Sequence, residues 1–253
     1  FTNIKEIKNQ INITGIAGDQ QSALYAQGGY NVGMTKCTYG TGCFILTNTG
    51  DDIVYSNKGL LSTITLNKQG APKYGIEGSV FIGGAAIQWL RDELGIINKA
   101  KETEKMAYSV NNTNGVYMVP AFVGLGAPYW NMDARGSITG ITRGTNKNHI
   151  VRAALNSIAY QVNDIIQIMR KVKGLEINEL LVDGGASQNN YLMQFQANIS
   201  NVLINRPQNI ESTVIGAAIL SSHKINFWSD KSKIRINNKL FKPEMDEPSR
   251  ENR

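Results

Sequence analysis

The sequence predicts a mixed α/β domain in which helices pack against a β-sheet. Strand-like segments separated by glycine turns gather in the first third of the chain, and strands alternate with helices in its last third. Between them, segment 148–173 carries apolar residues at helical spacing. Early strands followed by alternation are typical of helices layered on one sheet, and we expect that arrangement here.

The expected strands are short runs rich in β-branched, aromatic or apolar residues, bounded by turn-forming residues. They cover 35–39, 43–47, 59–66, 72–76, 116–120, 137–140, 179–183 and 202–205. Gly40-Thr41-Gly42 separates the first two strands, which predicts a tight turn, and a second turn is expected at Asn67 to Gly70.

Helices are predicted where apolar residues recur at intervals of three and four. They cover 83–94, 99–109, 148–173, 189–199 and 212–224. The third has the most continuous apolar stripe, and Gly174 is expected to end it. The chain from Phe241 onward is charged and contains two prolines, so we expect it to fray or be cut short. Three strands followed by strand–helix alternation is the order of a ribonuclease H-like half-domain, which is the fold we expect.

The composition indicates a globular chain with an ordinary core. Its 253 residues can form one large domain or two small ones, and 42% hydrophobic with 18% charged residues is average. No apolar run reaches membrane-spanning length, and residues 1–11 have the pattern of neither a signal peptide nor an anchor. We therefore expect a cytoplasmic protein with no membrane partner. The first residue is Phe rather than Met, which suggests a piece of a longer protein.

The net charge of +6 raises the possibility of nucleic-acid binding. Lys and Arg are scattered among Asp and Glu, however, and the largest basic groupings lie at 170–173 and 231–235. A solvated basic surface is the better interpretation, and we expect no nucleic-acid partner. Cys37 and Cys43 are predicted to be buried, reduced thiols.

Three glycine-rich turns, at 15–19, 39–42 and 183–186, are expected at strand ends. Successive backbone N–H groups in such turns can hold phosphate oxygens, and the last turn leads into a predicted helix whose N-terminus favours an anion. Each turn taken alone is more often only a tight turn. The chain lacks the Gly, four residues, Gly-Lys-Ser/Thr pattern, which argues against an ordinary P-loop kinase.

Two aspartates, Asp19 and Asp183, adjoin these glycines. A carboxylate in such a place can accept a hydroxyl proton or hold Mg²⁺ through water, but a helix-capping or turn role is commoner. Gln20 offers a second polar group beside Asp19 and favours a functional role there, whereas both interpretations stay open for Asp183. For His149 and His223, capping or surface roles are expected.

Several stretches with preserved spacing resemble the glycerol kinases of the FGGY carbohydrate-kinase family, from about residue 13 to residue 241. They are Gly15-Ile-Ala-Gly-Asp-Gln-Gln-Ser-Ala-Leu-Tyr-Ala-Gln27, Tyr39-Gly-Thr-Gly-Cys-Phe-Ile-Leu-Thr-Asn-Thr-Gly50, Gly124-Leu-Gly-Ala-Pro-Tyr-Trp130, Ala134-Arg-Gly-Ser-Ile-Thr-Gly-Ile-Thr-Arg-Gly144, Val182-Asp-Gly-Gly-Ala186 and Leu192-Met-Gln-Phe-Gln196. The second of these favours glycerol over sugars as the substrate.

The resemblance implies a role for each matching position in phosphoryl transfer to glycerol. It implies that Asp19 is the catalytic base, which takes the proton of the terminal hydroxyl and holds Mg²⁺ through water. Gln20 would bind another glycerol hydroxyl, and Phe44 would form the apolar wall against the carbon skeleton. The resemblance also implies ATP and Mg²⁺ as cofactors. The implied ATP-binding residues are Thr41, Gly84, Gln88, Gly185 and Asn189.

Family members are about twice this length and have two actin-like domains. The resemblance therefore implies that 1–28 is a trailing segment of an N-terminal domain and that 29–253 is the C-terminal nucleotide-binding domain. Residues up to about Gln27 would then lie loose. The implied partners are glycerol, the N-terminal domain of the same protein and other copies in a homo-oligomer. The chain alone is expected to be inactive.

Two alternatives to this function remain open. One is a kinase of the same family for another polyol or sugar, which would differ only in the substrate wall. The other is a non-catalytic nucleotide-binding module, as in actin-like and chaperone-like relatives. The pair Asp19 and Gln20 argues against such a module, because a nucleotide switch has no need of a hydroxyl base.

Overall fold

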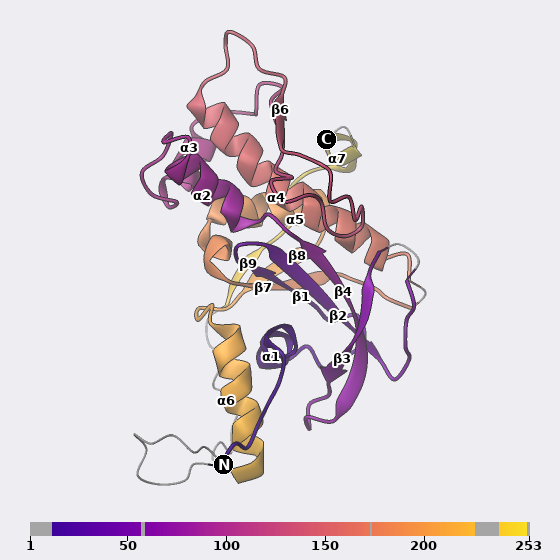
Figure 1. Cartoon of the computed structure of the whole chain (residues 1–253). Helices are drawn as coiled ribbons and strands as arrows, with labels where there is room; N and C mark the ends of the chain where they lie inside the picture. Colours follow the sequence, from indigo (N-terminus) through magenta and orange to yellow (C-terminus); the bar gives the residue numbers. More distant parts are fainter. Residues whose placement is uncertain (1–11, 57–58, 173, 226–237, 252–253) are drawn as a thin grey trace, which may run out of the picture.

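A seven-stranded mixed sheet forms the centre of the computed structural model (Figure 1), which describes residues 12–56, 59–172, 174–225 and 238–251. The strand order is β3-β4-β2-β1-β7-β8-β9. The strands are β1 (Thr35–Tyr39), β2 (Cys43–Gly50), β3 (Leu61–Leu66), β4 (Pro72–Val80), β7 (Glu179–Asp183), β8 (Leu203–Arg206) and β9 (Lys239–Phe241). The first four pair antiparallel, β1, β7 and β8 are parallel, and β9 is antiparallel. The predicted α/β class is confirmed.

Helices cover both faces of the sheet (Figure 1). On one side lie α4 (Lys147–Met169) and α5 (Asn190–Ser200), with α2 (Gly84–Asp92) and α3 (Glu102–Tyr108) beyond them. On the other side lie α1 (Asp19–Ala26) and α6 (Ser212–Ile225). The remaining elements are β5 (Tyr117–Val119) and β6 (Ser137–Thr139), which form a small second sheet, a 3₁₀ turn at Gly185–Gln188 and α7 (Glu247–Glu251).

Helix α4 supplies much of the core. The predicted apolar stripe is buried, with Val151, Ala154, Leu155, Ile158, Ala159, Val162, Ile165, Ile166 and Met169 each at most 1% exposed. Asn146 caps the helix by accepting bonds from the backbone of Asn148 and His149, and His149 Nδ1 accepts from the Asn146 backbone. The predicted capping role of His149 is confirmed.

The end of α4 differs from the prediction, because the helix stops at Met169 and not at the residue before Gly174. The backbone N–H groups of Lys171 and Val172 donate to carbonyls only three residues earlier, at Ile168 and Met169. This tighter winding ends the α-helix.

Helix α1 was not predicted, and residues 12–18, the described residues before it, form no strand. Asp19 is instead the first residue of an eight-residue helix whose residues Ser22 to Tyr25 are buried. The Ser22 hydroxyl donates to the Thr213 carbonyl at 2.7 Å, which fixes α1 on α6. Residues 19–26 are therefore packed and not loose, while 1–11 lie outside the described residues.

The expectation of a frayed end after Phe241 is wrong through residue 251. Phe241 is 5% exposed in strand β9, and α7 follows. Arg250 Nε donates to the Asn198 carbonyl at 2.8 Å, and the Glu244 backbone donates to Asn198 Oδ1 at 2.8 Å. Contacts to the end of α5 order this charged segment, and local sequence does not reveal them.

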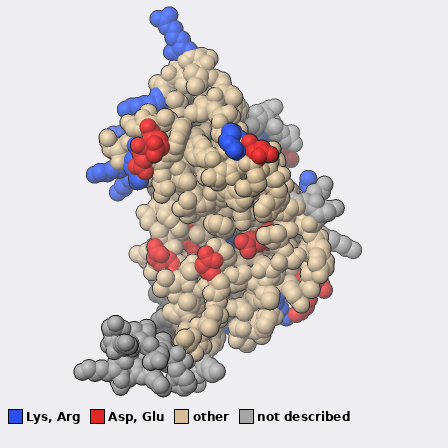
Figure 2. Space-filling view, viewed as in Figure 1, with Lys and Arg blue, Asp and Glu red and all other residues tan. Residues whose placement is uncertain are grey.

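The surface in Figure 2 bears interspersed charges. Blue Lys and Arg atoms lie mainly toward the end that carries α3 and β6, and separate red Asp and Glu groups cross the middle. On this face the basic residues do not merge into one patch. No helix among the described residues is long and apolar enough to cross a membrane.

Candidate functional site

Two predicted glycine turns meet at one edge of the sheet. Strands β1 and β7 are parallel neighbours, with Thr38 opposite Asp183, so the turns that follow them lie together. Gly184 has φ +84°, and a Cβ there would lie 2.6 Å from the Tyr39 carbonyl oxygen. A third glycine segment joins them, because Gly84 N donates to the Gly40 carbonyl at 2.8 Å. Only glycine permits so close a backbone approach.

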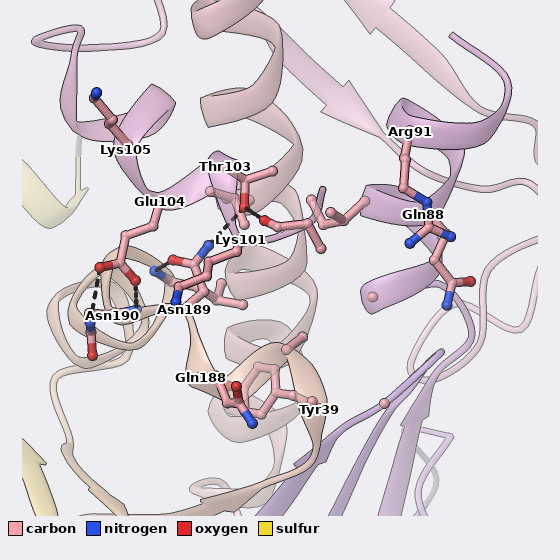
Figure 3. A pocket seen from close by; sticks show the side chains of 18 of the residues that line it. Tyr39, Gln88, Arg91, Lys101, Thr103, Glu104, Lys105, Gln188, Asn189 and Asn190 are labelled. Carbon is pink, nitrogen blue, oxygen red and sulfur yellow. Dashed lines mark hydrogen bonds between the residues drawn. The ribbon is translucent and has the colours of Figure 1, made fainter. Parts of the chain in front are cut away.

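A cavity of about 880 Å³ opens beside these turns (Figure 3). All five predicted ATP-binding residues line it: Thr41, Gly84, Gln88, Gly185 and Asn189. Gly185 faces open space, since a Cβ there would meet nothing within 4 Å. The cavity lies where open α/β sheets bind ligands, at the carboxyl ends of parallel strands. Its volume is within the range of small-molecule sites.

The wall of the cavity contains a hydrogen-bonded contact between α3 and the start of α5. Asn189 Nδ2 donates to Thr103 Oγ1 at 3.0 Å, while Asn189 Oδ1 caps α5 by accepting from Leu192 N at 3.0 Å. Glu104 accepts from both the backbone and the side chain of Asn190, at 2.6 and 2.9 Å (Figure 3). Sequence reasoning missed Thr103 and Glu104, because the sequence of a polar helix does not indicate which distant segment it will contact, here the start of α5.

The predicted substrate residues form a second group outside this cavity. Asp19 is exposed at the start of α1, and its two carboxylate oxygens accept from the Gln20 backbone at 2.8 Å and from Gln20 Nε2 at 3.0 Å. Gln20 Oε1 in turn accepts from Lys36 Nζ. Phe44 lies half-buried on β2, and its carbonyl accepts from the same Lys36 nitrogen at 3.2 Å.

Lys36, which contacts this second group, is the residue that sequence reasoning missed most clearly. It is 0% exposed, and its ammonium also donates to Thr38 Oγ1 at 2.9 Å. Burial lowers the pKa of Lys36, whereas the charges of Asp183, Glu77 and Asp19 act in the opposite direction. A lysine within a strand of buried residues was the available signal, since a buried ammonium requires partners.

Asp183 is a buried member of the same charge cluster and is 1% exposed. Burial raises its pKa, and the charge of Lys36 and hydrogen bonds from Thr38 and Ser212 oppose that rise. Its Oδ1 has no hydrogen-bond partner among the described residues. The sequence left open whether Asp183 has a functional or a structural role. Its burial and its interaction with Lys36 favour a structural role, as a buried counter-charge for the Lys36 ammonium.

The other candidate residues have local structural roles. The Tyr25 hydroxyl contacts His223 Nε2 at 2.5 Å. Cys37 and Cys43 are buried and free, which confirms that prediction. The described residues include no group of three or more His, Cys, Asp or Glu side chains that could hold a metal ion.

The fold and the glycine-lined cavity define an α/β domain with a pocket at the carboxyl ends of its parallel strands. The profile described as "FGGY family of carbohydrate kinases, C-terminal domain" matches residues 35–225. This chain belongs to the FGGY family of carbohydrate kinases.

Curated relatives give the same result. The chain is 54% identical over 245 residues to a glycerol kinase of Shewanella piezotolerans, covering 96% of this chain and 50% of the relative. It is 53% identical over 244 residues to a glycerol kinase of Clostridium botulinum, covering 95% of this chain and 49% of the relative. The chain thus spans about half the length of the curated relatives that it matches.

Solved structures share the fold. Plasmodium falciparum glycerol kinase with ADP superposes with a TM-score of 0.85 at 40% identity, over 93% of this chain and 48% of that one. A ligand-bound xylulose kinase from Lactobacillus acidophilus superposes with a TM-score of 0.73 at 21% identity, over 88% and 45%. The predicted ribonuclease H-like, actin-like ATPase fold is confirmed.

Proposed function

We propose that this chain is the C-terminal half of an ATP-dependent glycerol kinase and supplies its catalytic base and part of its ATP site. The observation that carries the proposal is the gathering of all five expected ATP-binding residues around one cavity, in a chain 54% identical to a glycerol kinase. The name of the Plasmodium falciparum structure, a glycerol kinase with ADP, agrees with it.

The reaction requires a base near one glycerol hydroxyl. In our proposal the terminal hydroxyl oxygen attacks the γ-phosphorus of ATP, its proton passes to the Asp19 carboxylate, and the bond from the γ-phosphorus to the bridging oxygen breaks. The products are glycerol 3-phosphate and ADP. The exposure of Asp19 and its place beside Gln20 support this assignment. Gln20 binds a second hydroxyl, and the ring of Phe44 packs against the carbon skeleton.

The nucleotide is assigned to the cavity, with its phosphates toward the glycine turns. Backbone N–H groups at Thr41 and Gly185 suit phosphate oxygens, while Gln88 and Asn189 line the adenosine side. Gly84 lines the cavity between them with its own N–H bonded to the Gly40 carbonyl. Mg²⁺, when bound, neutralises phosphate charge. Mg²⁺ commonly takes one or two carboxylates together with substrate phosphates and water. Asp19, acting through water, is the residue that we assign to it.

Several features of the whole protein belong to the same proposal. Residues 1–28 are assigned to the trailing segment of an N-terminal domain, and residues 29–253 to the C-terminal nucleotide-binding domain. The N-terminal domain of the same protein is the proposed partner of this chain. The coverage of about half of each relative supports the existence of that further domain. A homo-oligomer and a cytoplasmic location remain predictions from the resemblance.

The test is ADP release from MgATP by the full-length gene product, measured across a panel of polyols and sugars. We expect glycerol alone to drive turnover and Asp19→Asn to abolish it. Asp133→Asn, a change at an exposed carboxyl outside both groups of site residues, is the matched control and should keep wild-type activity. Turnover with another polyol would identify a different kinase of the family. ADP release that is independent of any polyol, or an active Asp19→Asn variant, would favour a nucleotide switch.

A further inference from the structure

The Lys36 ammonium has three acceptors, one for each of its protons. They are Gln20 Oε1 on α1, Thr38 Oγ1 at 2.9 Å on β1 and the Phe44 carbonyl at 3.2 Å on β2. Because Lys36 is 0% exposed and its protons are used, it has no access to a substrate. Two of its three acceptors nevertheless belong to residues that we assign to glycerol. A group so placed acts on the substrate only through its neighbours.

The chemistry of the ammonium determines which way the Gln20 carboxamide faces. An ammonium only donates hydrogen bonds, so the Gln20 atom that meets it is the oxygen. The amide nitrogen then points the other way, and one of its hydrogens is donated to Asp19 Oδ2 at 3.0 Å. Its second hydrogen can serve a substrate hydroxyl oxygen.

We propose that Lys36 is the positioning residue of the polyol site, holding Gln20 as a hydrogen-bond donor beside the acceptor Asp19. The proposal rests on the proposed function of Asp19, Gln20 and Phe44. A site with one donor next to one acceptor matches two neighbouring hydroxyls, one bound through its oxygen and the other through its proton. This pattern is the one that a 1,2-diol presents.

A purely structural role is the competing explanation. Negatively charged groups face Lys36 from three elements: Asp183 on β7, Glu77 on β4 and Asp19 on α1. Lys36 could therefore serve only to neutralise a buried carboxylate. That role predicts a loss of stability that is independent of Gln20, whereas positioning predicts that the effect of Lys36 disappears once Gln20 is removed.

The experiment is a double-mutant cycle in the full-length enzyme with Lys36→Met, Gln20→Leu and the double variant. Losing one substrate hydrogen bond costs roughly tenfold, so each single variant should raise the KM for glycerol about tenfold or more. The KM for MgATP should stay within about twofold of wild type in each variant, and the double variant should be no worse than Gln20→Leu alone within about twofold. Multiplying effects, or an effect on MgATP alone, would overturn the proposal.

Two further variants keep the test decisive. Thr47→Val removes a buried hydroxyl that bonds to Thr35 and Met169, so it should lower the melting temperature and leave the KM for glycerol unchanged. Lys36→Gln retains a buried donor; if Lys36→Met does not fold, this variant replaces it in the cycle, with a smaller rise in KM. A wild-type enzyme that does not use glycerol would refute the proposed function itself. Glycerol turnover with a multiplicative cycle would refute only the role of Lys36.

Discussion

Asn189 Nδ2 donates a hydrogen bond of 3.0 Å to Thr103 Oγ1, and this bond joins α3 to the start of α5 at the wall of the cavity. Thr103 is 1% exposed, so its hydroxyl is shielded from water. The same Asn189 side chain caps α5 through Leu192 N. Asn189 therefore fixes both the N-terminus of α5 and the position of α3 in the cavity wall.

Asn189→Ala should therefore weaken both stability and nucleotide binding. Losing the cap costs about 1 kcal/mol of unfolding free energy. Thr103→Val keeps the shape of the side chain but removes the acceptor of Asn189 Nδ2, so α3 is no longer bonded to Asn189. We expect this variant to bind MgATP a few-fold more weakly, with a smaller loss of unfolding free energy than Asn189→Ala. Calorimetric titration with MgATP and chemical denaturation would measure both quantities. Unchanged affinity in both variants would contradict a link between this bond and the nucleotide site.

Gly184→Ala should destabilise the protein more than Gly174→Ala, although both glycines have φ +84°. A positive φ disfavours any side chain at both positions. Gly184, with ψ 164°, also lies in a region that is essentially restricted to glycine, where another residue is strained by roughly 1–3 kcal/mol. At Gly184 the new Cβ would also lie 2.6 Å from the Tyr39 carbonyl oxygen, whereas at Gly174 it would meet nothing within 4 Å. Equal losses of unfolding free energy in the two variants would show that the close approach at Gly184 is unimportant.

Gly216→Ala should disturb the substrate side and spare the nucleotide side. A Cβ at Gly216 would lie 2.0 Å from the Ser22 carbonyl oxygen, so α1, which carries Asp19 and Gln20, has to shift. Overpacking of this kind should lower the unfolding free energy of the variant by roughly 1–3 kcal/mol. In the full-length enzyme the KM for glycerol should rise while the KM for MgATP stays constant. Ala218→Ser, on the exposed side of α6, should change neither constant.

The Tyr129–Asp164 pair should make stability depend on pH. Burial raises the pKa of Asp164, and the hydrogen bond from the Tyr129 hydroxyl at 2.9 Å opposes this rise. A carboxyl with a raised folded-state pKa destabilises the fold when ionised, and the penalty is relieved as pH falls through that pKa.

Asp164→Asn keeps an acceptor for Tyr129 without the charge. It should therefore gain unfolding free energy over wild type at neutral pH, and the gain should shrink in acid. Tyr129→Phe removes the opposing hydrogen bond, so it should lose stability, most of all at neutral pH. Denaturation at pH 7.5 and pH 4.5 would compare the three proteins. A constant difference across pH would show that the charge is not responsible.

The chain by itself should bind MgATP weakly and transfer little or no phosphate to glycerol. The prediction follows from the proposed need for an N-terminal domain, which the half-length coverage of its relatives supports. Calorimetry and a coupled ADP assay on the 253-residue chain would test it, with the full-length enzyme as the positive control. Glycerol-dependent turnover by the chain alone would contradict it.

The sequence by itself determined the elements whose signals are local. Apolar spacing along α4, the strand pairs around Gly40 to Gly42 and the strand–turn–helix unit at Asp183 to Asn189 all appear where they were expected. The five ATP-binding residues were assigned by resemblance from separate motifs, and they converge because parallel strands bring their carboxyl ends to one edge. Periodicity, turns and motifs are properties of short segments, which is why they could be predicted.

Tertiary structure alone decided the rest. Helix α1 has no apolar stripe and no side-chain cap, so it depends on packing against α6, nearly 200 residues later. Residues 239–250 are ordered by Asn198 and β8 rather than by their own composition. The burial of Lys36 requires acceptors from α1 and β2, and Asp183 adds its charge from β7. In each case the stabilising contacts join segments that are distant in the sequence, and no local sequence pattern encodes them.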